Sequence, residues 1–315
     1  MSNIQDKSTL QLALMPRYWP AAIGVIFFRL LTFLPLQVQF LLGKWGGRIF
    51  FWAGKRRRHI ATVNIDLCFP KLDAKQKQQI VRSAFESVGI TAALEVPNAW
   101  WGDEKTIAQI GKVHGIEHIQ QAQKQGKGVL LLSGHFTSLE IGCRILTKKI
   151  PTYNMYKMHR NELFDRVMKA SREKHTKGVI ERRDVRSFIR ALRKGEVCWY
   201  APDQDFGREA SVFAPFMGVQ TATLTATSRL AKMGNAVVIP FFPRRRRYEI
   251  GYDVFILPPL ENFPSGDDVK DAKLVNELFA EQVLLAPEQY LWGHRRFKTR
   301  PEGEPDVYGK KGAKR

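Results

Sequence analysis

The residue types best suited to catalysis lie close together at positions 133–140. An apolar run at 129–132 is followed by Ser-Gly, by His135 and, five residues later, by Glu140. Positions five apart in one regular helix are separated by about 140°, too far round to share a face. The two side chains therefore converge only if His135 lies on a loop that leads into the helix carrying Glu140. A carboxylate placed there would fix the imidazole tautomer and leave the other nitrogen as a base.

The absence of several common catalytic motifs limits the chemistry that this histidine could perform. The sequence contains no Gly-x-Ser-x-Gly elbow, no P-loop and no Gly-x-Gly-x-x-Gly, so it lacks the usual serine nucleophile and nucleotide-binding signatures. His135 is then best suited to act as a general base on an incoming hydroxyl group. The alternative is a structural histidine, because His and Glu at this spacing also occur by chance.

Two further segments concentrate polar residues. Asp203 and Asp205 follow an apolar run at 197–201, where a strand would end, and strand ends are where α/β folds place their sites. The alternative is a polar turn, since Asp, Gly and Pro are turn formers. The segment 289–300 interleaves aromatic and basic residues, among them Arg295 and Arg296. It could bind phosphates, line a membrane interface or simply end the fold.

The elements that position these residues follow from hydrophobic periodicity. Asp73 is expected to cap an amphipathic helix over 74–96. From residue 128 onward strand-like and helix-like runs alternate, which predicts an α/β fold with a mixed, largely parallel sheet flanked by helices. Strands are expected at 129–132, 152–156, 197–201, 236–242 and 248–257, and helices at 162–175, 185–193, 221–233 and 269–285.

The N-terminal region predicts a membrane helix. Residues 19–43 are strongly apolar with one charge, Arg29, and the basic residues Lys44, Arg48 and 55–58 follow. This pattern is typical of a chain that is inserted into a membrane or embedded in its interface, with its bulk in the cytoplasm; the alternative is a buried helix or hairpin of a soluble protein. We expect a polar segment at 1–18, a membrane-anchoring helix at 19–43, one large domain at 44–300 and a flexible basic tail at 301–315.

The net charge of +20 predicts an acidic partner. Nucleic acid is one candidate, but the sequence has no RNA-binding aromatic motif, zinc finger or zipper. Anionic lipid or a phosphorylated substrate fits the apolar N-terminus better. Three basic clusters, at 55–58, 244–247 and 295–300, are possible contacts, and a solvated basic face is the alternative for each. The three cysteines are scattered without metal-ligand spacing, so we expect no metal and no disulfide.

Taken together, several segments resemble one family. The segments 135–140, 201–207, 213–218 and 288–300 are similar to the late acyltransferases of lipid A biosynthesis, within the wider HX4(D/E) lysophospholipid acyltransferases. The combination of Asp-Gln-Asp at 203–205 with Tyr-Leu-Trp at 290–292 and His-Arg-Arg-Phe-Lys at 294–298 carries the resemblance most specifically. The Phe-Pro-Glu-Gly-Thr-Arg block expected of a glycerolipid acyltransferase is absent from the sequence.

The resemblance implies an inner-membrane enzyme that faces the cytoplasm. It would move an acyl chain from acyl carrier protein to the hydroxyl of a hydroxyacyl chain on a (Kdo)2-lipid IVA-type precursor, without a cofactor. The alternative is another glycolipid or lysophospholipid hydroxyl, with acyl-CoA or acyl carrier protein as donor.

The same resemblance implies roles for particular residues. His135 and Glu140 would be the catalytic pair, and Arg172, Asp203 and Asp205 would bind substrate or stabilise the transition state. Weaker basic contacts are expected from Arg244, Arg245, Arg295 and Arg296. The run 155–160 departs from a family pattern in which Tyr-Arg-Pro is frequent, which puts roles for its basic residues, Lys157 and Arg160, in doubt.

Overall fold

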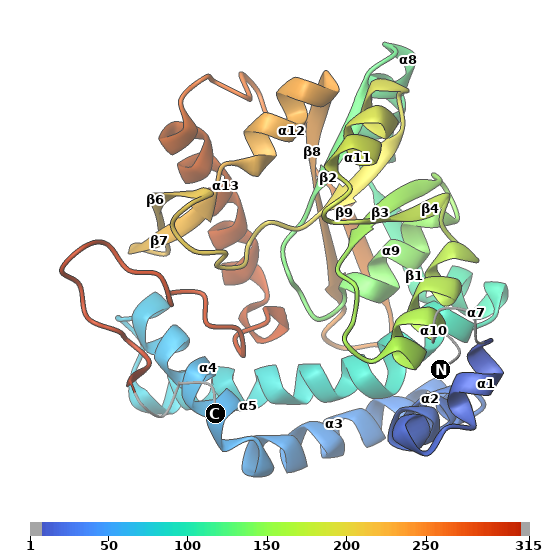
Figure 1. Cartoon of the computed structure of the whole chain (residues 1–315). Helices are drawn as coiled ribbons and strands as arrows, with labels where there is room; N and C mark the ends of the chain where they lie inside the picture. The colour runs from blue at the N-terminus through green and yellow to red at the C-terminus, as the bar shows by residue number, and fades with distance from the viewer. Residues whose placement is uncertain (1–7, 310–315) are drawn as a thin grey trace.

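One seven-stranded sheet organises the molecule (Figure 1). The computed structural model describes residues 8–309. The strands are β1 (Gly111–His114), β2 (Gly128–Leu132), β3 (Thr152–Tyr156), β4 (Gly178–Glu181), β5 (Val197–Tyr200), β8 (Ala236–Arg245) and β9 (Tyr252–Ile256). Their spatial order is β1-β9-β8-β2-β5-β3-β4, and every neighbouring pair is parallel except β8 and β9. The predicted α/β fold with a largely parallel sheet is therefore confirmed.

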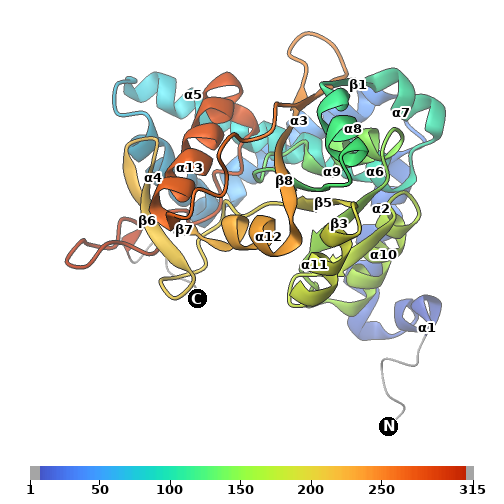
Figure 2. The same ribbon diagram turned by 90° about the horizontal axis from the view of Figure 1, so that it is seen from above.

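Helices cover both faces of this sheet. Those of the C-terminal two thirds are α8 (Ile116–Lys124), α9 (Leu139–Thr147), α10 (Glu162–Glu173), α11 (Val185–Arg193), α12 (Ala226–Gly234) and α13 (Asp268–Leu285). The central strand β2 is buried along its whole length, and its side chains alternate between the two faces. Leu130 and Leu132 pack with residues of α11, α12 and α13, whereas Val129 and Leu131 pack with residues of α8 and α9. Figure 2 shows α13 and α8 on opposite sides of β8.

The N-terminal third is helical. Its elements are α1 (Thr9–Ala13), α2 (Trp19–Leu31), α3 (Leu36–Ala53), α4 (Lys55–Cys68), α5 (Ala74–Ile90), the π-helical turn Thr91–Glu95, α6 (Val96–Trp101) and α7 (Glu104–Ile110). Asp73 caps α5 as predicted, because its side chain accepts a hydrogen bond from the backbone N–H of Gln76.

The membrane helix predicted over 19–43 is wrong as a single element. That segment contains α2 and the first part of α3, separated by a turn at 32–35. Pro35 precedes α3 and cannot continue a helix that runs into it, since it lacks an N–H and its ring crowds the preceding turn. Within residues 8–309, no helix combines the length and apolar character needed to cross a bilayer.

Helices α3 and α5 run side by side below the sheet in Figure 1 and approach each other very closely. Glycines make this approach possible. A Cβ atom on Gly43 would lie 2.6 Å from the Cα of Ile90, and one on Gly89 would collide with the backbone of Gly43 and Gly47. Helix α3 is therefore fixed along its length to the body of the molecule.

Two smaller differences from the predictions concern the C-terminal half. The helix expected over 221–233 begins only at Ala226, because the preceding residues form a hairpin of β6 (Ser211–Phe216) and β7 (Val219–Leu224). The tail expected to be flexible from 301 is anchored at Tyr308, whose buried hydroxyl donates to the side chain of Asn64 at 2.6 Å. Residues 310–315 of that tail, and 1–7 of the polar segment, lie outside the described residues.

Candidate active site

His135 lies on the loop between β2 and α9, as the spacing predicted. Two neighbouring segments hold this loop. The N–H of Ser133 donates to the carbonyl of Tyr200 in the strand beside β2, and the carbonyl of His135 accepts from the N–H of Leu291. The N–H of Thr137 donates to the carbonyl of Gln289 at 2.7 Å. The imidazole thus stands on a loop tied to the sheet and to the segment after α13.

The carboxylate that contacts the imidazole is that of Asp203. Its Oδ1 lies 2.5 Å from Nδ1 of His135, and its Oδ2 accepts from the backbone N–H of His135 at 2.9 Å. The Tyr290 hydroxyl donates to the same Oδ2 at 3.0 Å. Since β2 and β5 are parallel neighbours, the residues that follow them meet at one edge of the sheet.

These contacts set the charges of the pair. Burial by itself would raise the pKa of Asp203, but the positive charge and hydrogen bonds of His135 lower that pKa to about 2. Burial alone would lower the pKa of His135, yet the Asp203 carboxylate holds it above its ordinary value. An ionised Asp203 retains the proton on Nδ1 and leaves the Nε2 lone pair of neutral His135 free to accept another.

Glu140 has different partners from those expected. It lies in the first turn of α9 and forms a two-point ion pair with Arg172 of α10, with Nε to Oε1 at 2.8 Å and Nη2 to Oε2 at 2.6 Å. The indole N–H of Trp100 also donates to Oε1 at 2.7 Å. Burial would raise the pKa of Glu140, but Arg172 lowers it below its usual range. The expectation that Glu140 orients the imidazole is therefore not met; Asp203 occupies that place.

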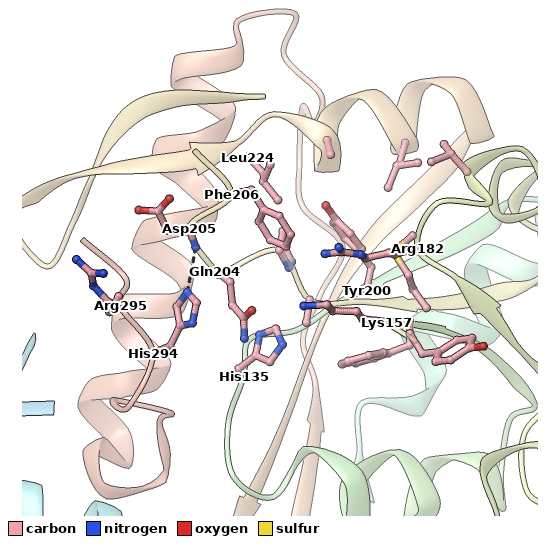
Figure 3. A pocket seen from close by; sticks show the side chains of 18 of the residues that line it. His135, Lys157, Arg182, Tyr200, Gln204, Asp205, Phe206, Leu224, His294 and Arg295 are labelled. Carbon is pink, nitrogen blue, oxygen red and sulfur yellow. Dashed lines mark hydrogen bonds between the residues drawn. The ribbon is translucent and has the colours of Figure 1, made fainter. Parts of the chain in front are cut away.

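A cavity of about 980 Å³ opens in front of His135. Figure 3 shows the imidazole at its lower edge, with the side chain of Gln204 reaching toward it and Lys157 and Arg182 beside them. One group of lining residues is apolar: Met155, Val185, Trp199, Phe206, Leu224, Ala226, Leu230 and Met233. A second group is cationic: Arg56, Arg57, Lys157, Arg182, Arg229, Arg295 and Lys298. The cavity thus offers both an apolar wall and a positive rim.

Asp205 and His294 shape the wall of this cavity beyond Gln204. The Asp205 carboxylate accepts from the N–H of Gly207 and from the N–H and hydroxyl of Thr299. Its own backbone N–H donates to Nε2 of His294 at 3.3 Å (Figure 3). Burial lowers the pKa of His294 to about 4, so this ring is neutral. Asp205 therefore joins two loops, and its carboxylate is occupied by these internal bonds.

The basic residues expected to contact substrate differ in their exposure. Arg295 lines the cavity. Arg245 is buried and pairs with Glu95 at 2.7 Å, and Arg296 is buried and donates to Asn276. Arg244 is half-buried against Phe255. The cluster at 244–247 is accordingly not a continuous exposed basic face, and surface contacts by Arg245 and Arg296 are excluded by their burial.

Sequence reasoning missed several lining residues. The cations Lys157, Arg182 and Arg229 come from three separate segments and reach one cavity only through the fold. The departure of 155–160 from the family pattern put a role for Lys157 in doubt, but Lys157 lines the cavity, whereas Arg160 is not among the lining residues. The family resemblance of 290–292 implied no particular role for Tyr290. Its position near Asp203 had no signal in the spacing, since 87 residues separate them.

Comparisons with known proteins agree on one family. The family model described as "Bacterial lipid A biosynthesis acyltransferase" matches residues 7–299. The chain is 40% identical to the lipid A biosynthesis lauroyltransferase of Escherichia coli (strain K12), over 98% of this chain and 100% of that protein. It is 37% identical to the palmitoleoyltransferase of the same strain, over 94% and 96% of the two chains, and 30% identical to its myristoyltransferase, over 94% and 92%. The chain is thus an acyltransferase that belongs to the bacterial lipid A biosynthesis acyltransferase family.

Proposed function

We propose that the protein moves a fatty acyl chain from acyl carrier protein to the hydroxyl of a hydroxyacyl chain on a (Kdo)2-lipid IVA-type precursor. The reaction would take place at the cytoplasmic face of the inner membrane. The observation that carries this proposal is the His135–Asp203 pair at the edge of a cavity with an apolar wall and a cationic rim. An acyl chain suits the wall, and the phosphates of a lipid A precursor suit the rim.

His135 would act as the general base. The acceptor hydroxyl has a very high pKa, so its proton must leave as its oxygen attacks the thioester carbonyl. Nε2 of neutral His135 accepts that proton, while Asp203 holds the ring and stabilises the imidazolium that forms. The same imidazolium then returns the proton to the departing thiolate. The orienting role given to Glu140 on the basis of its spacing passes to Asp203 in this mechanism.

Glu140 and Arg172 would position the loop and not touch the substrate. Neither is among the residues that line the cavity, and the ion pair between them joins the first turn of α9 to α10. The negative charge that develops on the carbonyl oxygen needs a donor elsewhere. The carboxamide of Gln204 extends toward the imidazole in Figure 3, and we propose its N–H for this role.

The direct test combines purified enzyme, lauroyl-acyl carrier protein and a hydroxyacylated glucosamine disaccharide phosphate bearing Kdo. We expect the acceptor to gain the mass of one lauroyl ester, and folded His135→Ala to lose this activity by about two to four orders of magnitude. Efficient transfer from acyl-CoA to a lysophospholipid or another glycolipid, with none to this acceptor, would favour the alternative substrate class. Near-normal turnover by folded His135→Ala would end the proposed mechanism.

A further inference from the structure

Helices α2 and α3, with the turn between them, carry a broad apolar surface that no other part of residues 8–309 covers. We call this surface the apolar face; its residues are Trp19, Ile23, Ile26, Phe27, Leu30, Phe33, Leu41, Leu42, Trp45, Ile49 and Trp52. Each of these side chains is between 46% and 73% exposed. So many exposed apolar side chains on two consecutive helices indicate an interaction site, since isolated exposed apolar residues would need no explanation.

On α3 the apolar face occupies one side of the helix. On α3, Leu41, Trp45, Ile49 and Trp52 recur at helical spacing on the outside, whereas Gly43 and Gly47 are buried on the inside. The close contact of these glycines with α5 fixes which side of α3 faces outward. The helix consequently lies along the surface of the protein and cannot turn away from it without breaking that contact.

The one charge within the apolar segment is directed toward the protein body. Nη1 of Arg29 donates to the carbonyl of Trp101 at 3.3 Å, and its guanidinium lies 5.8 Å from the centre of the Trp101 ring. The charge that interrupts the apolar sequence is thus held at the border between α2 and α6. The same guanidinium lies 5.8 Å from the centre of the Phe33 ring, so the charge also borders the apolar face.

Cations lie along the margin of the apolar face, next to its tryptophans. The guanidinium of Arg48 lies over the ring of Trp45, and that of Arg58 lies near the rings of Phe51 and Trp52. Beside Trp52 is a second cavity of about 760 Å³, whose lining includes four cations: Arg58, Lys75, Lys77 and Arg82. Tryptophan with Lys or Arg at the border of an apolar surface is the pattern of a membrane interface.

From these observations we propose that α2 and α3 lie in the plane of an anionic bilayer. The apolar face would enter the outer part of the acyl region, and the cations around Trp45 and Trp52 would meet lipid phosphates. This deepens the proposed function, on whose membrane location it rests. Helix α4 follows α3 directly, and its Arg56 and Arg57 line the catalytic cavity. Helix α4 thus connects the proposed membrane surface to the cavity in which a lipid acceptor would bind.

Depth measurements distinguish an in-plane helix from one that crosses. We would attach spin labels singly at Val38, Leu41, Trp45, Ile49 and Trp52 of the full chain carrying Cys143→Ser, in phosphatidylethanolamine–phosphatidylglycerol vesicles. Collision rates with oxygen and with a water-soluble nickel chelate then report depth. An in-plane α3 gives one shallow depth for all five labels. A crossing helix would spread positions 38 and 52 over about 21 Å, at 1.5 Å per residue. A label at Val269 of α13, which is 50% exposed, should remain in water.

A vesicle-flotation experiment tests the surface independently. The double variant Trp45→Glu, Ile49→Glu should bind these vesicles at least about tenfold more weakly than the unchanged protein, because placing a charge in the acyl region is costly. The matched variant Val269→Glu should bind as the unchanged protein does. Both should keep acyl transfer in detergent micelles and an unaltered circular dichroism spectrum. Replacing phosphatidylglycerol with phosphatidylcholine should weaken the binding of the unchanged protein, whereas free inorganic phosphate should compete poorly.

Three results would overturn the proposal. Labels on α3 that spread steadily in depth would show a crossing helix. Labels in water, together with unchanged binding of the double variant, would show that another surface meets the membrane. Strong dipolar broadening between labels on two chains, with no access for oxygen, would show that a second copy covers the apolar face. In-plane depths combined with no acyl transfer would instead contradict the proposed function and leave this inference intact.

Discussion

Nδ1 of His135 lies 2.5 Å from Oδ1 of Asp203, although 68 residues separate the two in sequence. The other carboxylate oxygen accepts from the His135 backbone N–H and from the Tyr290 hydroxyl. Asp203 therefore fixes both the ring and the main chain of the histidine. A buried carboxylate with this many donors stays ionised, which is the state needed to stabilise an imidazolium during acyl transfer.

Asp203→Asn should separate orientation from charge. The amide retains the shape of the side chain but cannot stabilise the imidazolium, so we expect kcat to fall by about two to four orders of magnitude. The base form of His135 is the neutral one, so activity rises with pH through the pKa of His135, which the Asp203 charge holds above its ordinary value. Without that charge the pKa falls, and the acidic limb of the pH–rate profile should move to lower pH.

The matched variant for this experiment is Glu140→Gln. It removes a comparable negative charge, but one whose bonds go to Arg172 and Trp100. Its acidic limb should remain nearly in place even if its turnover falls. A larger shift of the limb in Glu140→Gln than in Asp203→Asn would return the orienting role to Glu140.

The sequence was sufficient to place His135 but not to find its partner. A buried apolar run followed by Ser-Gly and a polar turn is a local signal, and the structure confirms the strand, the loop and the helix that follow. The choice between Glu140 and Asp203 depends on which loop lies beside β2. That is a matter of strand order, because β5 pairs with β2 across a long stretch of chain, and hydrophobic periodicity carries no information on strand order.

The prediction of a single helix over 19–43 failed for a related reason. Hydropathy over 19–43 registers the amount of apolar surface and not the direction in which it points. The break at Pro35 was visible in the sequence, but the contact of Gly43 and Gly47 with α5 was not. In the same way, the sequence predicted Arg245 and Arg296 as surface contacts, but the fold buries them beside Glu95 and Asn276.

The Glu140–Arg172 ion pair should contribute measurably to stability. Both side chains are mostly buried, at 19% and 23% exposure. Removing either one leaves the other charge without its partner, so Glu140→Ala and Arg172→Ala should each lower the free energy of unfolding by about 2 kcal/mol. The double variant should lose less than the sum, which a double-mutant cycle in denaturant measures. Strictly additive losses would show that the two residues act separately.

The contact between α3 and α5 should depend on its glycines. A methyl group at Gly47 would collide with the backbone of Phe85 and Glu86, so Gly47→Ala should cost about 1–3 kcal/mol through overpacking. The neighbouring Gly46 has no atom within 4 Å of the position of an added Cβ. Gly46→Ala should therefore stabilise the helix by up to about 1 kcal/mol. Thermal unfolding of both variants in detergent gives the comparison, and equal effects would argue against the close packing described here.

The cationic rim should govern docking of the acyl donor. The proposed donor, acyl carrier protein, is acidic, whereas coenzyme A lacks such a protein surface. Lys157 and Arg182 line the cavity that would receive its acyl chain under the proposed function. Added salt screens exposed charges over about 10 Å at about 0.1 M. The KM for acyl carrier protein should therefore rise with salt more than the KM for acyl-CoA.

The double variant Lys157→Ala, Arg182→Ala should reproduce this salt effect. We expect its KM for acyl carrier protein to rise several-fold while kcat stays nearly constant, because the interactions removed are similar in the ground state and the transition state. Lys124→Ala is the control, since Lys124 is exposed on α8 and is not among the cavity-lining residues. A rise confined to the KM of the lipid acceptor would assign the two cations to lipid phosphates instead. No change in either KM for the double variant would exclude Lys157 and Arg182 from substrate binding.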